Sequence, residues 1–203
     1  MRLLLRASLA LAAAMSVIVS VAAASPAQAA ILSGPTCSQG SLSQPFLAWG
    51  DTNSYSLIAG GDFEGSLSSW TLSGGAKLLA GSEPYKAAGA LGKYSMSLPP
   101  GASALTPFTC VNVAYPTFRF FARNEALASS LLVQVLYKTP LGTLTASLGA
   151  VVPAGTWHPS PAVLTNSVIG GVLSGGTGQV AFRISAITGA SRIDDLFLDP
   201  RMH

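Results

Sequence analysis

Short alternating or apolar stretches, each closed by glycine, proline, asparagine or serine, recur between residues 69 and 198. Nine of them are candidate strands: residues 69–73, 76–80, 94–98, 108–113, 117–123, 131–138, 143–151, 179–187 and 192–198. Closely spaced short strands with turn residues between them are typical of a β-sandwich. The pattern predicts an all-β fold, and no repeat or long linker points to a second domain.

Two of these stretches indicate which side faces the core. One face of residues 131–138 is uniformly apolar, and one face of residues 179–187 is apolar while the other carries Arg183 and Ser185. Since alternate residues of a strand point to opposite sides, we expect these apolar sets inside the sandwich: Leu131, Val133, Val135 and Tyr137, and Val180, Phe182, Ile184 and Ala186. With 49% hydrophobic and 9% charged residues, the chain is not expected to be disordered.

Residues 1–29 have the features of a secretory signal peptide. Arg2 and Arg6 precede an apolar run over residues 7–24, and Ala27-Gln28-Ala29 forms a small-residue cleavage box. An uncleaved membrane anchor is the alternative, because the run approaches the ~20 residues that span a bilayer. The alanine-rich run and the cleavage box favour cleavage after Ala29. We therefore expect a secreted protein without a stable membrane anchor.

The charge balance argues against nucleic acid as a partner. The chain has 11 basic and 8 acidic residues, a net charge of +3. Two of the basic residues, Arg2 and Arg6, lie in the predicted signal peptide, so the mature charge is 9 minus 8, or +1. The remaining lysines and arginines form no cluster of the kind that binds phosphate backbones.

An export signal also bears on the two cysteines. In an oxidising compartment Cys37 and Cys110 are expected to form one disulfide, the alternative being two unconnected buried thiols. Residues 34–59 show little periodicity. We interpret residues 30–59 as an irregular N-terminal extension, laid over the sandwich and pinned by Cys37, and residues 60–203 as the sandwich itself.

No motif of a known catalytic site is present. The sequence contains no G-x-S-x-G, H-E-x-x-H, phosphate-binding loop or dinucleotide fingerprint. His158 lies between Trp157 and Pro159 in a predicted loop, and no particular pair of acids is marked for glycosidase chemistry. The sequence therefore favours a protein that is not an enzyme.

Five of the eight acidic residues fall in two short stretches: Asp62 and Glu64, and then Asp194, Asp195 and Asp199. Calcium is one explanation, because it takes 6 to 8 oxygen ligands and several carboxylates can contribute. Without a metal, Asp62 would cap a turn. Asp194 or Asp195 would then pair with an arginine of the sheet surface, Arg192 or Arg183.

The two acidic stretches resemble the ends of galactose-binding-like jelly-roll domains, a group that includes many non-catalytic carbohydrate-binding modules. The first reads Asp62-Phe63-Glu64-Gly65 and is followed by Ser69-Trp70, and the second reads Ile193-Asp194-Asp195-Leu196-Phe197-Leu198. In such domains the first and last strands lie together, and acids from both often hold a structural calcium ion. The resemblance implies Asp62, Glu64 and Asp194 or Asp195 as ligands. Gly60 departs from the pattern, since these modules usually carry asparagine there.

With residues 117–124 included, the chain also resembles a group of small secreted actinobacterial proteins. Carbohydrate-binding modules stack sugar rings on exposed aromatic side chains, and five aromatics outside the clear core positions are candidates: Trp49, Tyr55, Tyr85, Tyr115 and Trp157. Phe63 and Trp70 are expected in the core. Three strand arginines either line a concave sheet or are solvated on its exterior: Arg119, Arg123 and Arg183.

The leading hypothesis is a single jelly-roll domain that binds carbohydrate or another cell-envelope component without catalysis. A protein that binds a protein partner or coats the envelope is the alternative. A glycan hydrolase or lyase is a third hypothesis, and it would need a pocket that encloses two acids or His158 with an acid.

Overall fold

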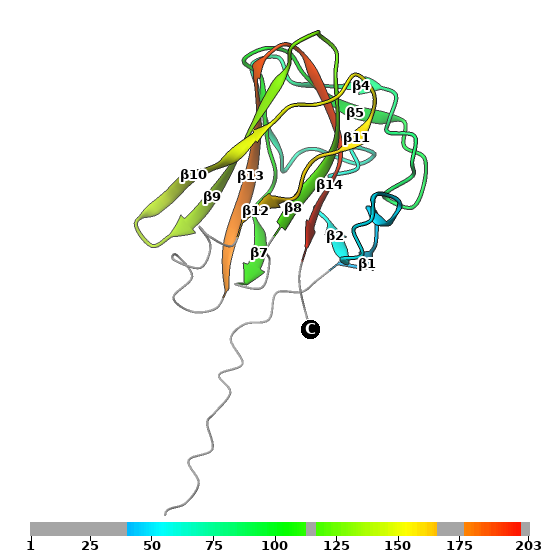
Figure 1. Ribbon diagram of the computed structural model, residues 1–203. Coiled ribbons are helices and arrows are strands. Elements are labelled where there is room, and N and C mark those ends of the chain that lie inside the picture. The colour runs from blue at the N-terminus through cyan, green and yellow to red at the C-terminus, as the bar shows by residue number, and fades with distance from the viewer. Residues whose placement is uncertain (1–39, 113–116, 166–176, 200–203) are drawn as a thin grey trace, which may run out of the picture. The chain divides into compact units, whose positions relative to one another are not determined.

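A computed structural model describes residues 40–112, 117–165 and 177–199, which form two antiparallel sheets packed face to face (Figure 1). One sheet contains β1 (Leu42–Ser43), β2 (Tyr55–Leu57), β4 (Lys77–Ala80), β5 (Tyr94–Leu98), β8 (Thr117–Asn124), β11 (His158–Pro159), β12 (Val163–Leu164) and β14 (Ser191–Asp199). The other contains β3 (Thr71–Ser73), β6 (Ser103–Leu105), β7 (Thr109–Asn112), β9 (Ser130–Thr139), β10 (Gly142–Val151) and β13 (Thr177–Thr188). The predicted all-β jelly-roll sandwich is confirmed.

The centre of the eight-stranded sheet is β14. It pairs with β8 along one side, and on the other side with β5 near Ser191 and with β2 near Phe197. The ladder with β8 shifts register between Asp194 and Phe197, where Asp195 has a φ of 46°. This bulge lies in the acidic stretch that the sequence singled out.

All nine predicted stretches contain a strand, and five short strands were not predicted: β1, β2, β6, β11 and β12. Two of these, β1 and β2, belong to the expected N-terminal extension. Because β2 pairs with β14, its residues are part of the sheet and do not merely lie over it. His158, expected in a loop, is paired with Ala122 of β8.

Two apolar clusters fill the domain. The main core lies between the sheets and contains both predicted strand faces, together with Phe63 and Trp70. A second cluster lies on the other side of β8 and β14, because Phe121 and Phe197 alternate with the core residues Phe120 and Leu198. Residues of the N-terminal segment and the β10–β11 loop cover it: Phe46, Tyr55 and Trp157.

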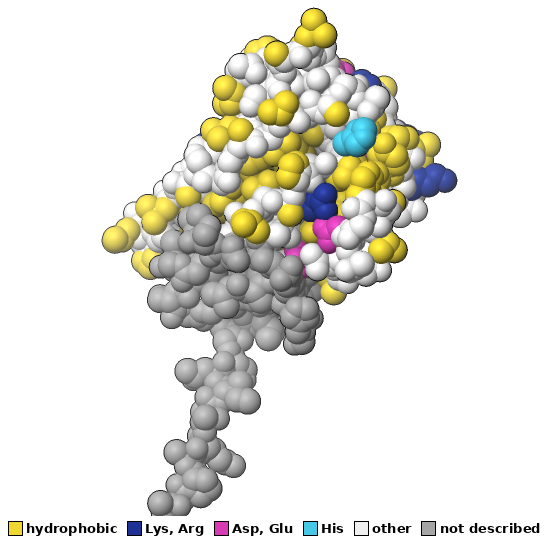
Figure 2. Space-filling view, in the orientation of Figure 1, with side chains coloured by type: hydrophobic (Ala, Val, Ile, Leu, Met, Phe, Trp, Pro, Cys, Tyr) yellow, Lys and Arg dark blue, Asp and Glu magenta, His cyan; other side chains and the backbone are white. Residues whose placement is uncertain are grey.

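The β9–β10 hairpin carries exposed hydrophobic side chains at and beside its tip, Leu141 and Leu144 (Figure 2, left). Within the described residues β10 pairs only with β9, and it contains no charged residue and no proline. Natural sheet edges are usually blunted by such residues. A protein partner, the alternative inferred from the sequence, stays a hypothesis.

Several predictions fall on the rest of the chain. The signal peptide over residues 1–29, Cys37 and Tyr115 lie outside the described residues. Cys110 lies on β7, and the described part contains no free cysteine. The disulfide stays a prediction. In those described ranges, no helix has the length and hydropathy needed to cross a membrane.

Candidate functional site

A groove of about 760 Å³ lies between two segments that are distant in sequence. One is the N-terminal segment around the short 3-10 helix η1 (Leu47–Trp49), and the other is the loop that follows β4. The groove is lined by Ser43, Gln44, Pro45, Leu47, Ala48, Trp49, Tyr85, Lys86 and Ala87. The rings of Trp49 and Tyr85 meet edge to face with their centroids 4.8 Å apart. The groove thus has an aromatic wall and a polar rim.

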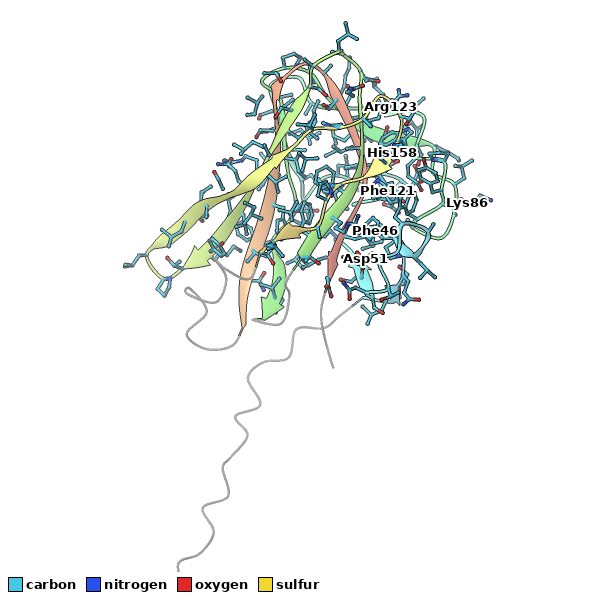
Figure 3. All side chains as sticks on the ribbon, in the orientation of Figure 1. Phe46, Asp51, Lys86, Phe121, Arg123 and His158 are labelled. Carbon is cyan, nitrogen blue, oxygen red and sulfur yellow. The ribbon has the colours of Figure 1, made fainter. Side chains whose placement is uncertain are left out.

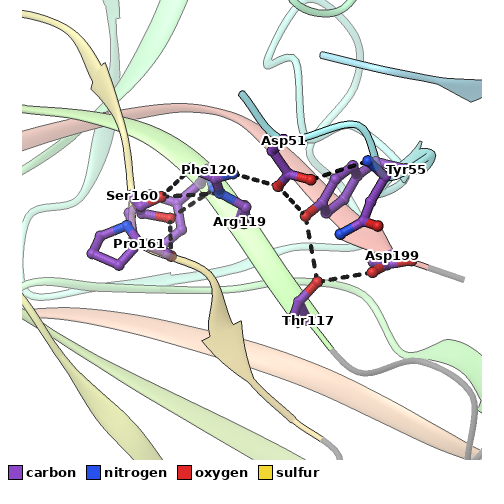
Figure 4. A network of polar contacts seen from close by, with 9 residues as sticks. Asp51, Tyr55, Thr117, Arg119, Phe120, Ser160, Pro161 and Asp199 are labelled. Carbon is purple, nitrogen blue, oxygen red and sulfur yellow. Dashed lines mark hydrogen bonds and ion pairs between the residues drawn. The ribbon is translucent and has the colours of Figure 1, made fainter. Parts of the chain in front are cut away.

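A largely buried ion pair holds the N-terminal segment against β8 (Figure 4). The Arg119 guanidinium donates to Asp51 Oδ2 and, through Nε and Nη2, to the Ser160 carbonyl at 3.0 and 2.8 Å. Tyr55 donates its hydroxyl to the same Asp51 oxygen at 2.7 Å and lies 3.4 Å from Thr117 Oγ1. These contacts fix the chain just after η1.

The charge of Asp51 depends on this network. Burial alone would raise its pKa, but the hydrogen bonds from Tyr55, from the Asn53 amide and from Arg119, with the Arg119 charge, bring the pKa below its ordinary value. Asp51 is therefore ionised at neutral pH, and the pair with Arg119 is a true ion pair.

Aromatic packing continues from this network to the groove. The Arg119 guanidinium lies over the Phe46 ring, 4.2 Å from its centroid, and Phe46 stacks on Phe121. Trp49 and Tyr85 both contact Phe121, with centroid distances of 5.4 and 5.7 Å. Figure 3 shows Phe46, Phe121 and Asp51 close together beside β8. Phe121 thus packs beneath Trp49 and Tyr85, the two aromatic residues that line the groove.

Buried carboxylates fix the loop after β4, which carries Tyr85 and lines the groove opposite the N-terminal segment. Glu83 is buried and accepts the amide hydrogens of Tyr85, at Oε2, and of Ala87, at Oε1. The Tyr85 hydroxyl donates to the Trp157 carbonyl at 2.8 Å. A side chain that accepts amides two and four residues further on forces the loop into a tight turn, and this turn presents the Tyr85 ring to the groove.

Asp194 and Asp195 tie the same loop to the bulge in β14. Asp194 Oδ2 accepts from Ser82 Oγ at 2.7 Å and from the Glu83 amide at 2.8 Å, while Asp195 Oδ2 accepts from the Ala88 amide at 3.0 Å. Burial, and then the neighbouring negative charges, raise the pKa of Asp194 to about 7 and that of Asp195 to about 8. The last strand thereby positions the groove loop.

The four expected calcium ligands are not brought to one point. Asp62 accepts the Glu64 amide, as expected of a turn cap, and Glu64 accepts the amides of Lys93 and Tyr94. Glu64 and Asp194 both lie beside Ser82, and Asp195, which holds the Ala88 amide, is close enough to Asp194 and Glu83 for their charges to raise its pKa. In the described part of the chain, no three acidic, histidine or cysteine residues are grouped as metal ligands.

The alternative explanation for the later acids, an ion pair with a surface arginine, is wrong. Arg192 donates to the carbonyls of Leu79, Ala80 and Gly81, and its nearest acidic partner is Glu125, at 3.9 Å. Asp194 and Asp195 instead accept hydrogen bonds from the loop.

Calcium stays a prediction, with Glu64, Asp194 and Asp195 as its remaining candidate ligands. It predicts that calcium raises the unfolding midpoint by about 3 °C relative to EDTA, because a ligand that binds only the folded state stabilises it. Glu64→Ala should abolish that rise, and Asp62→Ala, which changes an acid of the turn alone, should keep it. Equal midpoints in calcium and EDTA would exclude the ion.

Of the five predicted aromatics, the structure brings Trp49 and Tyr85 together in the groove. The predictions for two other aromatics, Tyr55 and Trp157, are wrong. Tyr55 is fully buried, and Trp157 is only 9% exposed, so neither ring offers a face to a sugar. Both lie in the second cluster, which sequence alternation does not reveal. Tyr115 lies outside the described residues.

The groove also contains residues that sequence reasoning missed, Gln44 and Lys86 among them. No local pattern marks them, because their place depends on a contact between distant segments. No acidic residue and no histidine is among the lining residues given above. His158, instead, has Nδ1 3.2 Å from Thr156 Oγ1.

A comparison with models of protein families finds no match, and neither does a comparison with curated proteins. Among solved structures, the chain is similar to the CBM22-1 and GH10 modules of the Clostridium thermocellum endo-1,4-beta-D-xylanase 10B, complexed with xylohexaose. The TM-score is 0.51 at 12% identity, and the match covers 68% of this chain but only 27% of that one.

Smaller domains of similar length also match. The CBM22-2 xylan-binding domain of Paenibacillus barcinonensis Xyn10C has a TM-score of 0.45 at 15% identity, over 70% of this chain and 98% of that one. TmCBM61, in complex with beta-1,4-galactotriose, has a TM-score of 0.42 at 20% identity, over 71% and 98%. At these identities a likeness indicates a fold and no more, and the xylanase modules share the fold of this chain.

Proposed function

We propose that this protein is a secreted, non-catalytic module that binds carbohydrate, a cell-envelope glycan or another polysaccharide, in the Trp49–Tyr85 groove. The observation that carries the proposal is the meeting of two partly exposed aromatic rings in one groove, from segments that are far apart in sequence. The jelly-roll fold and the carbohydrate-binding modules among similar structures support it.

The chemistry of the groove suits a sugar. Aromatic rings offer flat apolar faces, and Tyr85 is 44% exposed. Gln44 and Ser43 provide an amide and a hydroxyl at the rim, where they can exchange hydrogen bonds with sugar hydroxyls. Since the loop backbone is already held by Glu83 and Asp195, binding does not have to order it.

The test is retention on insoluble polysaccharides and on a glycan array. We expect Trp49→Ala and Tyr85→Ala each to weaken binding by about 5- to 150-fold, since loss of an aromatic ring that stacks on a nucleic-acid base costs about 1–3 kcal/mol and a stacked sugar is treated in the same way. Tyr94→Ala is the matched control: Tyr94 is 43% exposed, lies on β5 and does not line the groove.

Thermal unfolding of each variant separates a lost ligand contact from a lost fold. The proposal fails if the folded wild-type protein is retained on no glycan, or if Tyr94→Ala weakens retention as much as the two groove variants. A protein partner, the alternative inferred from the sequence, would then become the leading hypothesis.

A further inference from the structure

The outer face of the six-stranded sheet has a polar hollow of about 380 Å³. Strand register brings its residues into two rows. Arg183 of β13 lies directly between Gln134 of β9 and Leu105 of β6. In the neighbouring row Ser185 lies beside Ser103, which in turn lies beside Ser73 of β3. All of these residues line the hollow.

Among the residues that the structure describes, Arg183 has no partner, unlike Arg119 and Arg123. Arg119 pairs with Asp51 in the N-terminal segment, and Arg123 pairs with Glu125 at 3.0 Å. Within the described residues, Arg183 makes no ion pair and no hydrogen bond, although its side chain is half-buried. No acidic residue lines the hollow. The Arg183 guanidinium therefore keeps all five of its N–H donors for a ligand.

The groups around Arg183 add further donors. Ser73 and Ser103 share a hydrogen bond of 2.8 Å between their hydroxyls, which uses one hydroxyl hydrogen and leaves the other for a ligand. The Gln134 amide and the Ser185 hydroxyl supply more. A hollow with one unpaired arginine, several neutral donors and no carboxylate matches an anionic group with several acceptor oxygens.

We propose that this hollow binds the anionic group, a carboxylate or a sulfate, of an acidic polysaccharide. The ligand class extends the proposed carbohydrate-binding function and rests on it. The site is separate, because Arg183 lies on the six-stranded sheet and the groove belongs to the outer side of the other sheet. Arg183 makes a two-pronged contact with the anion, and the serines and Gln134 hold the remaining oxygens or adjacent sugar hydroxyls.

The test measures affinity for two matched pairs of polymers: polygalacturonate against its methyl ester, and dextran sulfate against dextran. We expect tighter binding to at least one charged polymer than to its neutral partner, and a loss of at least tenfold in Arg183→Gln. Arg183→Lys should recover only part of the loss, because a lysine ammonium keeps the positive charge but cannot donate two parallel hydrogen bonds as a guanidinium does. Lys77→Gln removes one positive charge from an exposed site on β4 of the other sheet and should change affinity less than twofold.

The charged polymer that binds more tightly than its neutral partner, and loses affinity in Arg183→Gln, identifies the anion: a carboxylate for polygalacturonate, a sulfate for dextran sulfate. Equal losses in Arg183→Gln and Lys77→Gln would overturn the proposal, because attraction would then be a property of net charge alone. Equal affinity for charged and neutral polymers would overturn it as well. Trp49→Ala separates the two sites: if it abolishes neutral-glycan retention but leaves the Arg183-dependent binding, both hold. If no neutral glycan binds but Arg183-dependent binding persists, only the groove proposal fails.

Discussion

Replacing Arg119 with alanine is expected to lower the free energy of unfolding by about 3 kcal/mol, as for other buried pairs that lose one partner. The substitution removes the charge partner of the partly buried Asp51 carboxylate, removes two donors from the Ser160 carbonyl and uncovers the Phe46 ring. For a domain of this size such a loss lowers the unfolding midpoint by about 6–12 °C.

Arg123→Ala is the matched control for this measurement. Arg123 lies on the same face of β8 and also pairs with an acid, but its side chain is 34% exposed where that of Arg119 is 10% exposed. An exposed pair contributes about 0–1 kcal/mol. Thermal and denaturant unfolding should therefore show a clearly larger loss of stability for Arg119→Ala than for Arg123→Ala. Equal losses would mean that the ion pair does not hold the N-terminal segment. Glycan retention should fall with Arg119→Ala, since that segment carries Trp49.

Replacing Gly189 with alanine is expected to cost about 3 kcal/mol, the sum of a left-handed backbone penalty and a steric clash. Gly189 has a φ of 60°, and a Cβ there would clash with the Ala128 carbonyl oxygen and lie 3.0 Å from Ser129 Cα. These are backbone atoms, so no side-chain rotation relieves the contact. The turn joins β13 to β14, and a shift there disturbs the register of both sheets.

Gly101→Ala separates the two contributions. Gly101 has a φ of 80° and no atom within 4 Å of its Cβ position, so its substitution should cost only the backbone part, about 1 kcal/mol. Denaturant midpoints of the two variants, measured side by side, give the comparison. If Gly101→Ala proves as damaging as Gly189→Ala, the close approach to Ala128 contributes nothing.

Sequence periodicity was sufficient to predict the nine longer or alternating strands and the two inner faces, but not the five short strands β1, β2, β6, β11 and β12. Leu131, Val133 and Val135 alternate with half-buried or outward residues, and all three are buried in the structure. The burial of these residues depends only on which side of their own strand faces the core, and the alternation of residues along that strand indicates this side. The three residues of β2 carry no such pattern, because their pairing with β14 joins opposite ends of the described chain.

The residues of the candidate site were predictable only in part, for a similar reason. An aromatic such as Trp49 in an irregular segment is a reasonable candidate, but exposure depends on what covers the ring. Tyr55 and Trp157 are covered because the eight-stranded sheet has apolar residues on both faces. The acidic stretches were noticed correctly and explained incompletely, since the partners of Asp194 and Asp195 are amides of a distant loop.

The central position of β14 has a consequence for how the protein folds. The strands β2, β5 and β8 do not pair with one another; each pairs with residues of β14, which follows all of them in the chain. A chain still under synthesis can form the β4–β5 and β9–β10 hairpins, but the three parts of the larger sheet stay apart until residues 191–199 emerge. Folding that waits for long-range pairing is slow, and the exposed strand edges meanwhile favour association with other chains.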